Sequence, residues 1–293
     1  MEIKLSYWLV AFRPKTLTAA LVPILVATAL VASQTQNVQW WISGMALLAS
    51  LCIQIGTNLV NDAADFKKGA DTIDRLGPQR VTQAGLFSAR RVLIVAAGFF
   101  VLAAICGIPL VAKGGAVIVV VGLLSILMGY AYTAGPFPLA YLGLGDLFVI
   151  LFFGFVAVGG MAFLHQGRLS SADLVLGFQI GLLCAALIAI NNLRDIDGDT
   201  KADKKTLPVR FGKKFARIEI AVLVFLPFIL NIYWILNGQK WAGILPFLML
   251  PLGANLVKLV FKIEPSRVYN KFLGKAAALH LGFGLLFVVG ILL

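Results

Sequence analysis

Acidic residues are scarce in this chain: 13 of its 293 residues are Asp or Glu, and charged residues of both signs make up only 13%. A typical soluble domain carries roughly 25% charged residues. With 60% hydrophobic residues and a mean hydropathy of +0.94, the composition excludes an ordinary soluble domain and indicates an integral membrane protein. No polar linker or shift in composition divides the sequence, so we expect residues 1–293 to form a single membrane-embedded domain.

Cysteine and histidine are also rare. Cys52, Cys106 and Cys184 each lie inside an apolar run, which favours small buried side chains over a disulfide or a metal site. His165 falls in a predicted outer loop and His280 in a predicted span, so neither is assigned a catalytic role. The alternating pattern of barrel strands is lacking as well, which leaves α-helices as the structure that satisfies the backbone within a bilayer.

Long apolar runs are what the chain has in abundance. A run of roughly 20 residues is long enough to cross the hydrocarbon core of a bilayer as a helix. Nine such runs are predicted, at residues 17–33, 40–60, 92–111, 115–132, 147–164, 173–193, 218–236, 241–261 and 273–293. The first run has no convincing small-residue cleavage site after it, so it is interpreted as a helix rather than a signal peptide. The predicted fold is therefore an all-α bundle of nine transmembrane helices.

Lys and Arg are distributed unevenly between the two sides of this predicted bundle. Of the 25 basic residues, only Lys113, Arg168 and Lys240 fall in loops on one side, and all the others fall on the opposite side. Because basic loops are retained in the cytoplasm, we expect a plasma-membrane protein with a cytoplasmic N-terminus and a C-terminus on the opposite side. Topology thus accounts for the net charge of +12, and nucleic-acid binding is not expected.

Eight of the 13 acidic residues gather in two short segments, 58–74 and 191–203, and each segment follows a long apolar run. In the first segment, Asn58, Asp62 and Asp65 stand at positions i, i+4 and i+7, which places them on one face of a helix. Gly69 is suited to end this helix, so that Asp71 folds back toward the same point. The first segment therefore predicts a group of carboxylates at the end of a span.

The second segment repeats this arrangement. Asn191, Asp195 and Asp199 stand at positions i, i+4 and i+8, again on one helix face, and on the same predicted side of the membrane as the first segment. Gathered carboxylates repel one another, and oxygen ligands suit a divalent cation such as Mg²⁺, which shares its coordination shell with substrate phosphates. The two segments therefore predict a magnesium site for a diphosphate at the cytoplasmic face.

Basic residues close to the two segments are candidates to contact phosphate oxygens. They are Lys67, Lys68, Arg75, Arg80, Lys201, Lys204, Lys205 and Arg210. Each of them also serves the excess of positive charge in cytoplasmic loops, and aspartates at helix ends often only cap a loop. Two such segments on one side favour the metal and diphosphate interpretation over capping.

The two aspartate motifs, Asn61-Asp62-x-x-Asp65 and Asp195-x-x-x-Asp199, resemble those of the UbiA superfamily of intramembrane aromatic prenyltransferases. The nine-helix bundle of that superfamily agrees with the number of predicted spans. Five stretches resemble its menaquinone branch, the 1,4-dihydroxy-2-naphthoate polyprenyltransferases, at residues 13–17, 68–72, 77–85, 132–146 and 191–199. The common superfamily pattern has a further aspartate where Gly69 stands, and the branch resemblance implies that Asp71 replaces it.

The resemblance implies a reaction as well as a fold. A polyprenyl diphosphate would be ionised on Mg²⁺, and an electron-rich aromatic acceptor, 1,4-dihydroxy-2-naphthoate, would attack the allylic carbon and lose its carboxylate as CO₂. The resemblance gives as metal ligands Asp62, Asp65, Asp71, Asp195 and Asp199. Prenylation of 4-hydroxybenzoate or homogentisate is an alternative. A membrane transporter is an alternative of another class, although acids at the ends of spans and on one side are not typical of a carrier.

Further residues are candidates for contact with substrate or for catalysis. The four asparagines of the two segments are predicted to contact substrate: Asn58, Asn61, Asn191 and Asn192. Tyr132 follows a span on the cytoplasmic side and is a candidate to face a cation or bind diphosphate, or else an interfacial anchor. Asp146 is a candidate acceptor ligand or base, or else a helix cap. Arg13 and Lys15 are candidates to bind the acceptor carboxylate or the diphosphate.

Overall fold

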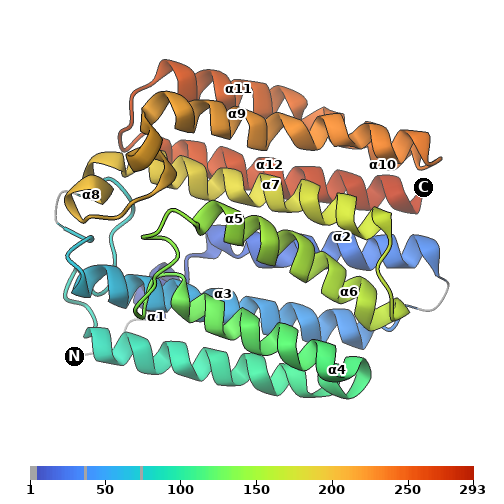
Figure 1. The fold of residues 1–293 in the computed structure, drawn as a ribbon, viewed down its shortest axis with the longest axis horizontal. Helices are drawn as coiled ribbons and strands as arrows, with labels where there is room; N and C mark the ends of the chain where they lie inside the picture. The colour runs from blue at the N-terminus through green and yellow to red at the C-terminus, as the bar shows by residue number, and fades with distance from the viewer. Residues whose placement is uncertain (1–4, 36–37, 73–74) are drawn as a thin grey trace.

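The computed structural model describes residues 5–35, 38–72 and 75–293 of the chain, so Lys4 and Asp74 lie outside the described residues. Helices dominate the described part, and most of them run along the long axis of the molecule (Figure 1). The α-helices are α1 (Leu5–Phe12), α2 (Thr18–Gln34), α3 (Trp40–Lys67), α4 (Ala89–Ala131), α5 (Gly145–Val149), α6 (Ala157–Gln166), α7 (Ser171–Arg194), α8 (Ile196–Lys201), α9 (Leu207–Leu236), α10 (Lys240–Ile244), α11 (Leu250–Lys262) and α12 (Tyr269–Leu292). Two short 3₁₀ segments, η1 (Pro14–Thr16) and η3 (Leu245–Met249), and a π-helical segment, η2 (Ile150–Val156), complete them.

Seven spans within the described ranges are long and apolar enough to cross a membrane, or eight if the pair formed by residues 6–16 and 18–34, which is bent by 49°, counts as one. All-helical membrane architecture is thereby confirmed. One reason for the difference from the predicted nine is α4, which covers two predicted runs in a single element of 43 residues. The number of nine spans stays a prediction.

Helix α4 turns back on itself (Figure 1). Its backbone leaves helical geometry at Gly115, where φ is +62° and ψ is −150°. Only glycine adopts this conformation without strain, because it has no Cβ. The element is therefore two helical arms joined at Gly115, and the turn lies at the end of the bundle opposite to α8.

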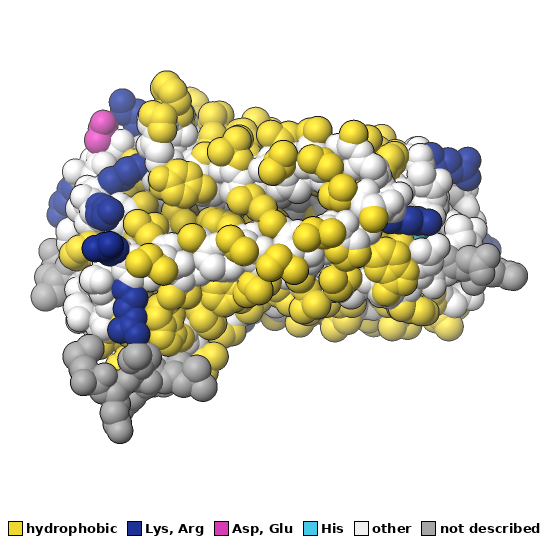
Figure 2. Space-filling model, turned by 90° about the horizontal axis from the view of Figure 1, so that it is seen from below, with side chains coloured by type: hydrophobic (Ala, Val, Ile, Leu, Met, Phe, Trp, Pro, Cys, Tyr) yellow, Lys and Arg dark blue, Asp and Glu magenta, His cyan; other side chains and the backbone are white. Residues whose placement is uncertain are grey.

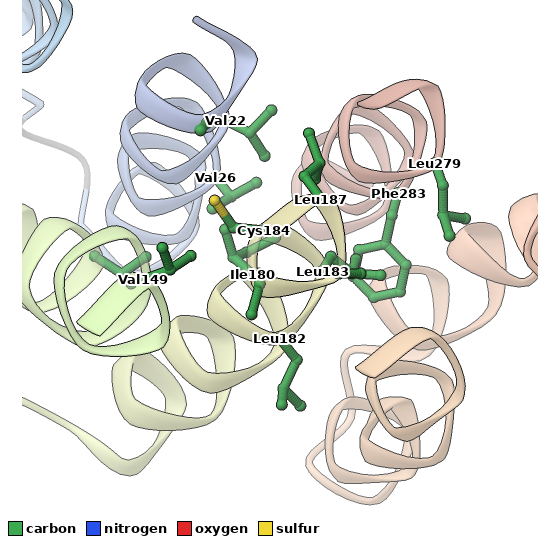
Figure 3. Packing of buried hydrophobic residues seen from close by; sticks show 14 of the residues in the cluster. Val22, Val26, Val149, Ile180, Leu182, Leu183, Cys184, Leu187, Leu279 and Phe283 are labelled. Carbon is green, nitrogen blue, oxygen red and sulfur yellow. The ribbon is translucent and has the colours of Figure 1, made fainter. Parts of the chain in front are cut away.

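Helix α7 forms the centre of the main core and is buried along most of its length. Figure 3 shows Ile180, Leu183 and Cys184 of α7 among side chains of the neighbouring helices, including Val26 of α2 and Phe283 of α12. Segment η2 approaches α7 at Gly154, where an added Cβ would clash with the backbone of residues 177–181. This close approach of two backbones fixes the span α5–η2–α6 against α7.

A second, smaller apolar cluster joins α1, α3 and the first arm of α4. Trp8 of α1 stacks on Phe87, with 4.3 Å between the ring centroids, and Leu59 of α3 is fully buried in this cluster. The cluster lies at the end of the bundle where α3 ends and α4 begins. The two clusters thus hold two groups of helices, and the cavity described below is lined by residues of both groups.

Side chains on the surface follow the pattern of a membrane protein. Figure 2 shows an apolar band over the middle of the face that it displays, with Lys and Arg side chains gathered at the two ends of the molecule. More of these basic side chains lie at the end that carries α8 in Figure 1. An apolar belt between charged ends is the surface that a bilayer requires.

Candidate functional site

The first aspartate segment lies on the last turns of α3, which extends beyond the predicted end at residue 60 to Lys67. Asn58, Asp62 and Asp65 are buried there and line one cavity, as their spacing on a helix face predicts. Gly69 follows the end of the helix, and its φ of +72° is the left-handed conformation expected of a glycine at that position.

The second segment lies at the junction of α7 and α8. Asp195 stands between the two helices, and Asp199 lies in α8. Asn191, Asp195 and Asp199 line the same cavity as Asp62 and Asp65, and the cavity has a volume of about 1140 Å³. The structure therefore brings the two aspartate segments, which are more than 110 residues apart in the sequence, to one site.

The carboxylates of the first segment are held by hydrogen bonds from other elements. Asp62 accepts the backbone N–H groups of residues 81–82 at 3.2 and 3.1 Å. Asp65 accepts the hydroxyl of Tyr141 at 2.8 Å and lies 3.9 Å from the guanidinium of Arg80. The segment between α3 and α4 is thus fixed over the end of α3 by the aspartates themselves.

In the second segment, Arg194 is the main partner. It is 1% exposed and donates from Nε and Nη2 to the two carboxylate oxygens of Asp195, at 2.8 and 2.5 Å. The same guanidinium donates to Oδ1 of Asn191 at 2.8 Å and to Oδ1 of Asn270 in α12 at 2.7 Å. Asp199 lies 3.5 Å from the ammonium group of Lys204. A guanidinium that binds two side chains of the second segment fixes their orientation.

The donor set suits Mg²⁺. Asp62, Asp65, Asp195 and Asp199 offer only oxygen atoms to the cavity, as a hard divalent cation requires. Among the residues that the structure describes, no three acidic, histidine or cysteine side chains form a ready cluster around one point. Each of the four carboxylates has a protein partner instead, so a cation held here would share or replace the partners described above.

Some of the predicted basic residues line the cavity and others do not. Those that line it are Arg13, Lys15, Arg75, Arg80 and Lys201, together with Lys204. Lys68 instead donates to the carbonyl of Thr133 at 2.8 Å and lies over the ring of Tyr141. Arg210 donates to two loop carbonyl groups, and Lys205 is an exposed partner of Asp203. The positions of Lys68, Lys205 and Arg210 are explained by these local contacts, and contact with phosphate remains a prediction for all three.

Asp71 does fold back toward α3, but it does not line the cavity. Its carboxylate pairs with Arg75 and lies 3.5 Å from Nε of Arg80. Since Arg80 also faces Asp65, Asp71 reaches the site through arginine side chains rather than directly. Its predicted role as a metal ligand stays a prediction.

Tyr132 lines the cavity, and its hydroxyl lies against the backbone of Gly145, where an added Cβ would stand 2.9 Å away. Asp146 is buried and does not line the cavity. It accepts a hydrogen bond of 3.4 Å from Asn192, which does line it. Asp146 would therefore act on an acceptor indirectly, by orienting the side chain of Asn192.

Two asparagines of α3 form hydrogen bonds with the residues at the end of α1. Asn58 donates to the carbonyl of Phe12 at 3.1 Å, and Arg13 donates to Oδ1 of Asn61 at 2.9 Å. The backbone of Arg13 is left-handed, with φ at +52°, which is unfavourable for a residue with a side chain. The strained conformation is maintained by these bonds and aims the guanidinium into the cavity.

Three residues of this site were not singled out as site residues from the sequence: Arg194, Tyr141 and Asn270. Arg194 directly precedes Asp195 and follows Asn191 by three residues, so its position within the second segment is a signal in the sequence. Tyr141 lies 76 residues from its partner Asp65, and Asn270 lies 76 residues from its partner Arg194. Only the folded chain brings these partners together.

Burial and neighbouring charges shift the ionisation of groups at this end of the bundle. Burial raises the pKa of Asp199 to about 6, while Lys204 opposes the rise. Burial, and then the Asp65 carboxylate, raises the pKa of Tyr141, so that its hydroxyl remains a donor. Burial lowers the pKa of Arg75, and carboxylates of both segments, Asp195 first, oppose that change. Carboxylates of both segments therefore stabilise the charged form of Arg75.

The UbiA prenyltransferase family matches residues 20–289, and the chain belongs to this family. It is 33% identical over 308 residues to a 1,4-dihydroxy-2-naphthoate octaprenyltransferase of Haemophilus influenzae, with 99% of this chain and 97% of the relative covered. It is 34% identical to the Escherichia coli protein of the same name, with 98% and 95% covered. The resemblance inferred from the motifs is thereby confirmed at the level of the family and of its menaquinone branch.

Solved structures of the family share the fold. A UbiA homologue from Archaeoglobus fulgidus, bound to DMAPP and Mg²⁺, superposes with a TM-score of 0.63 at 19% identity, with 96% of this chain and 99% of that chain covered. The apo structure of a homologue from Aeropyrum pernix gives a TM-score of 0.69 at 17% identity, with 94% and 96% covered. At these identities the likeness concerns the arrangement of the helices.

Proposed function

We propose that this chain transfers a polyprenyl group from polyprenyl diphosphate to 1,4-dihydroxy-2-naphthoate, with loss of CO₂, in menaquinone biosynthesis. The observation that carries the proposal is one cavity that has five aspartates at one end and mainly apolar side chains along the rest. Such a cavity suits a donor with a charged head and a long hydrocarbon tail. The choice of naphthoate is supported by the names of relatives that are 33% and 34% identical over nearly the full chain.

We assign the diphosphate to the aspartate end. Asp62, Asp65, Asp195 and Asp199 would hold Mg²⁺, which when bound neutralises the charge that develops on the departing diphosphate. Arg75, Arg80 and Lys201 line the same end and would contact phosphate oxygens. Their guanidinium and ammonium groups add positive charge where the leaving group gains negative charge.

The transfer breaks one bond in the donor and replaces the carboxylate of the acceptor. The C–O bond of the donor breaks with its electron pair on the diphosphate, and the ring carbon that bears the carboxylate forms the new C–C bond. Loss of CO₂ then returns an electron pair to the ring, so that no proton has to be removed from that carbon. Apolar residues would exclude water from the allylic cation, and Arg13, which lines the cavity, would orient the acceptor carboxylate.

We further propose that the chain crosses the plasma membrane nine times, with the aspartate end on the cytoplasmic side. Counting the two arms of α4 separately, and α2 with its bent N-terminal partner as one span, supports this number. The uneven distribution of Lys and Arg supports the orientation.

This topology is testable by cysteine labelling of intact cells. Arg168 lies in the exposed loop after α6, and we expect Arg168→Cys to react with a membrane-impermeant maleimide in intact cells. Lys214 is exposed at the aspartate end, and we expect Lys214→Cys to react only after the cells are permeabilised. The chain without either substitution provides the background, since its three cysteines lie within helices. Labelling of Lys214→Cys in intact cells would contradict the orientation.

The reaction itself is tested with purified protein. We expect release of diphosphate from octaprenyl diphosphate only when Mg²⁺ and 1,4-dihydroxy-2-naphthoate are both present, together with one CO₂ for each prenylated ring. EDTA should stop the reaction, and added Mg²⁺ should restore it, because the four carboxylates offer oxygen ligands only. A product formed from 4-hydroxybenzoate or homogentisate but not from the naphthoate would overturn the choice of acceptor.

A further inference from the structure

The cavity extends far beyond the aspartates. Its lining follows α3 from Asp65 to Ala46, which corresponds to roughly 28 Å at the rise of an α-helix. This length is close to the thickness of the hydrocarbon core, about 30 Å. The cavity therefore reaches from the charged end of the bundle almost to the opposite end.

The turn of α4 closes the far end of the cavity. Leu110, Ile118 and Leu164 line it there and are only 5%, 6% and 5% exposed. A Cβ added to Gly114 would clash with Ile118 and stand 3.1 Å from Leu164 of α6, so the turn of α4 packs tightly against α6. A tail that enters from the aspartate end meets this apolar floor.

Glycines leave part of the cavity open between the aspartates and the floor. Gly122 of α4 and Gly160 of α6 both line the cavity, and an added Cβ at either position would have no neighbouring atom within 4 Å. Gly122 lies ten residues from Tyr132, or roughly 15 Å along the helix, and Gly160 lies 15 residues from Gly145, or roughly 22 Å. Helix α4 ends, and the span α5–η2–α6 begins, at the charged end of the bundle. The two glycines therefore mark two different depths in the cavity.

We propose that Gly122 and Gly160 set the longest prenyl tail that the cavity accepts. The inference rests on the proposed function, because it places the diphosphate of the donor at the aspartates. Side chains longer than glycine at these positions would occupy the path of the tail, while the charged end and the acceptor site would be unchanged. A short donor ends before it reaches Gly160, whereas a long donor must pass both glycines.

The test compares short and long donors. In Gly160→Leu, we expect kcat/KM for octaprenyl diphosphate to fall about tenfold or more, as filling an apolar pocket does, while kcat/KM for geranyl diphosphate stays within about twofold of the unsubstituted chain. Gly122→Leu lies closer to the aspartates, so it should also reduce the use of donors of intermediate length, such as geranylgeranyl diphosphate. Gly160→Ala should give a smaller effect in the same direction.

Gly98→Leu provides the matched control. Gly98 also lies in α4 with no atom within 4 Å of an added Cβ, but it is exposed and does not line the cavity. Leucine has the higher helix propensity at all three positions, so none of the variants loses helix stability through propensity. We expect Gly98→Leu to use every donor as the unsubstituted chain does.

The outcomes separate this inference from the proposed function. Equal loss of short and long donors in both cavity variants, or unchanged use of octaprenyl diphosphate, would overturn the role of the glycines while prenyl transfer itself stands. Failure of the unsubstituted chain to prenylate the naphthoate with any donor would overturn the proposed function instead.

Discussion

Replacement of Asp62 or Asp195 by alanine is expected to reduce prenyl transfer by about a thousandfold, the scale of losing a main stabiliser of developing charge. Each carboxylate belongs to one of the two aspartate segments, and both line the same cavity. Loss of either leaves the diphosphate with ligands from one segment only. The measurement is the rate of diphosphate release by purified variants that insert into the membrane at the normal level.

Asp62→Asn separates the negative charge from the structural role of this side chain. Asp62 accepts two backbone N–H groups from residues 81–82, and an asparagine retains one accepting oxygen. We expect Asp62→Asn to be as inactive as Asp62→Ala but closer to the unsubstituted chain in thermal stability. Near-normal turnover of Asp62→Asn would show that the charge is not needed.

Asp203→Ala is the matched control for these variants. Asp203 belongs to the second segment, but its side chain is 87% exposed and it does not line the cavity. Its ion pair with Lys205 is at the surface, where such pairs contribute about 0–1 kcal/mol. We expect Asp203→Ala to keep normal turnover and to lose at most a little stability, because the backbone of Asp203 is left-handed, with φ at +51°.

Replacement of Arg194 by methionine is expected to lower both stability and turnover strongly. Arg194 is buried, and its loss leaves the Asp195 carboxylate without its guanidinium partner. Breaking a buried pair in this way costs about 3–5 kcal/mol, and the 14% exposure of the Asp195 side chain places the expected cost at the lower end. The measurement is the midpoint of thermal unfolding in detergent, together with prenyl transfer.

A double substitution distinguishes the two effects. Arg194→Met combined with Asp195→Asn removes both charges, so most of the lost stability should return, whereas prenyl transfer should not. Lys213→Met serves as the control, because the half-exposed Lys213 pairs with the exposed Glu264 and its loss should cost at most about 1 kcal/mol. If the double variant regained activity with its stability, Asp195 would have no role in binding diphosphate.

Apolar runs of the sequence were sufficient to predict where the long helices lie. The predicted runs 40–60 and 173–193 fall within α3 and α7, because a bilayer demands continuous apolar segments. The sequence did not predict α1 or the π-helical segment η2 as separate elements. Segment η2 packs against α7 through the close approach at Gly154, which is a tertiary contact that no local pattern specifies.

Helical spacing also predicted part of the candidate site. Asn58, Asp62 and Asp65 line the cavity together because positions i, i+4 and i+7 share a face. The partners of these carboxylates were not predictable in the same way. Tyr141 reaches Asp65 from a loop, and the path of Asp71 depends on Arg75 and Arg80, so both contacts arise only when distant segments fold together.

Residues 75–82 join the two groups of helices at the charged end. On one side their backbone is bonded to Asp62 of α3, and on the other the carbonyl of Leu76 accepts the side chain of Asn270 of α12 at 2.9 Å. The side chain of Asn270 in turn accepts from Arg194 of α7. Spreading these helices apart at the charged end would have to break this tether, so the two groups of helices are held together around the aspartate end of the cavity.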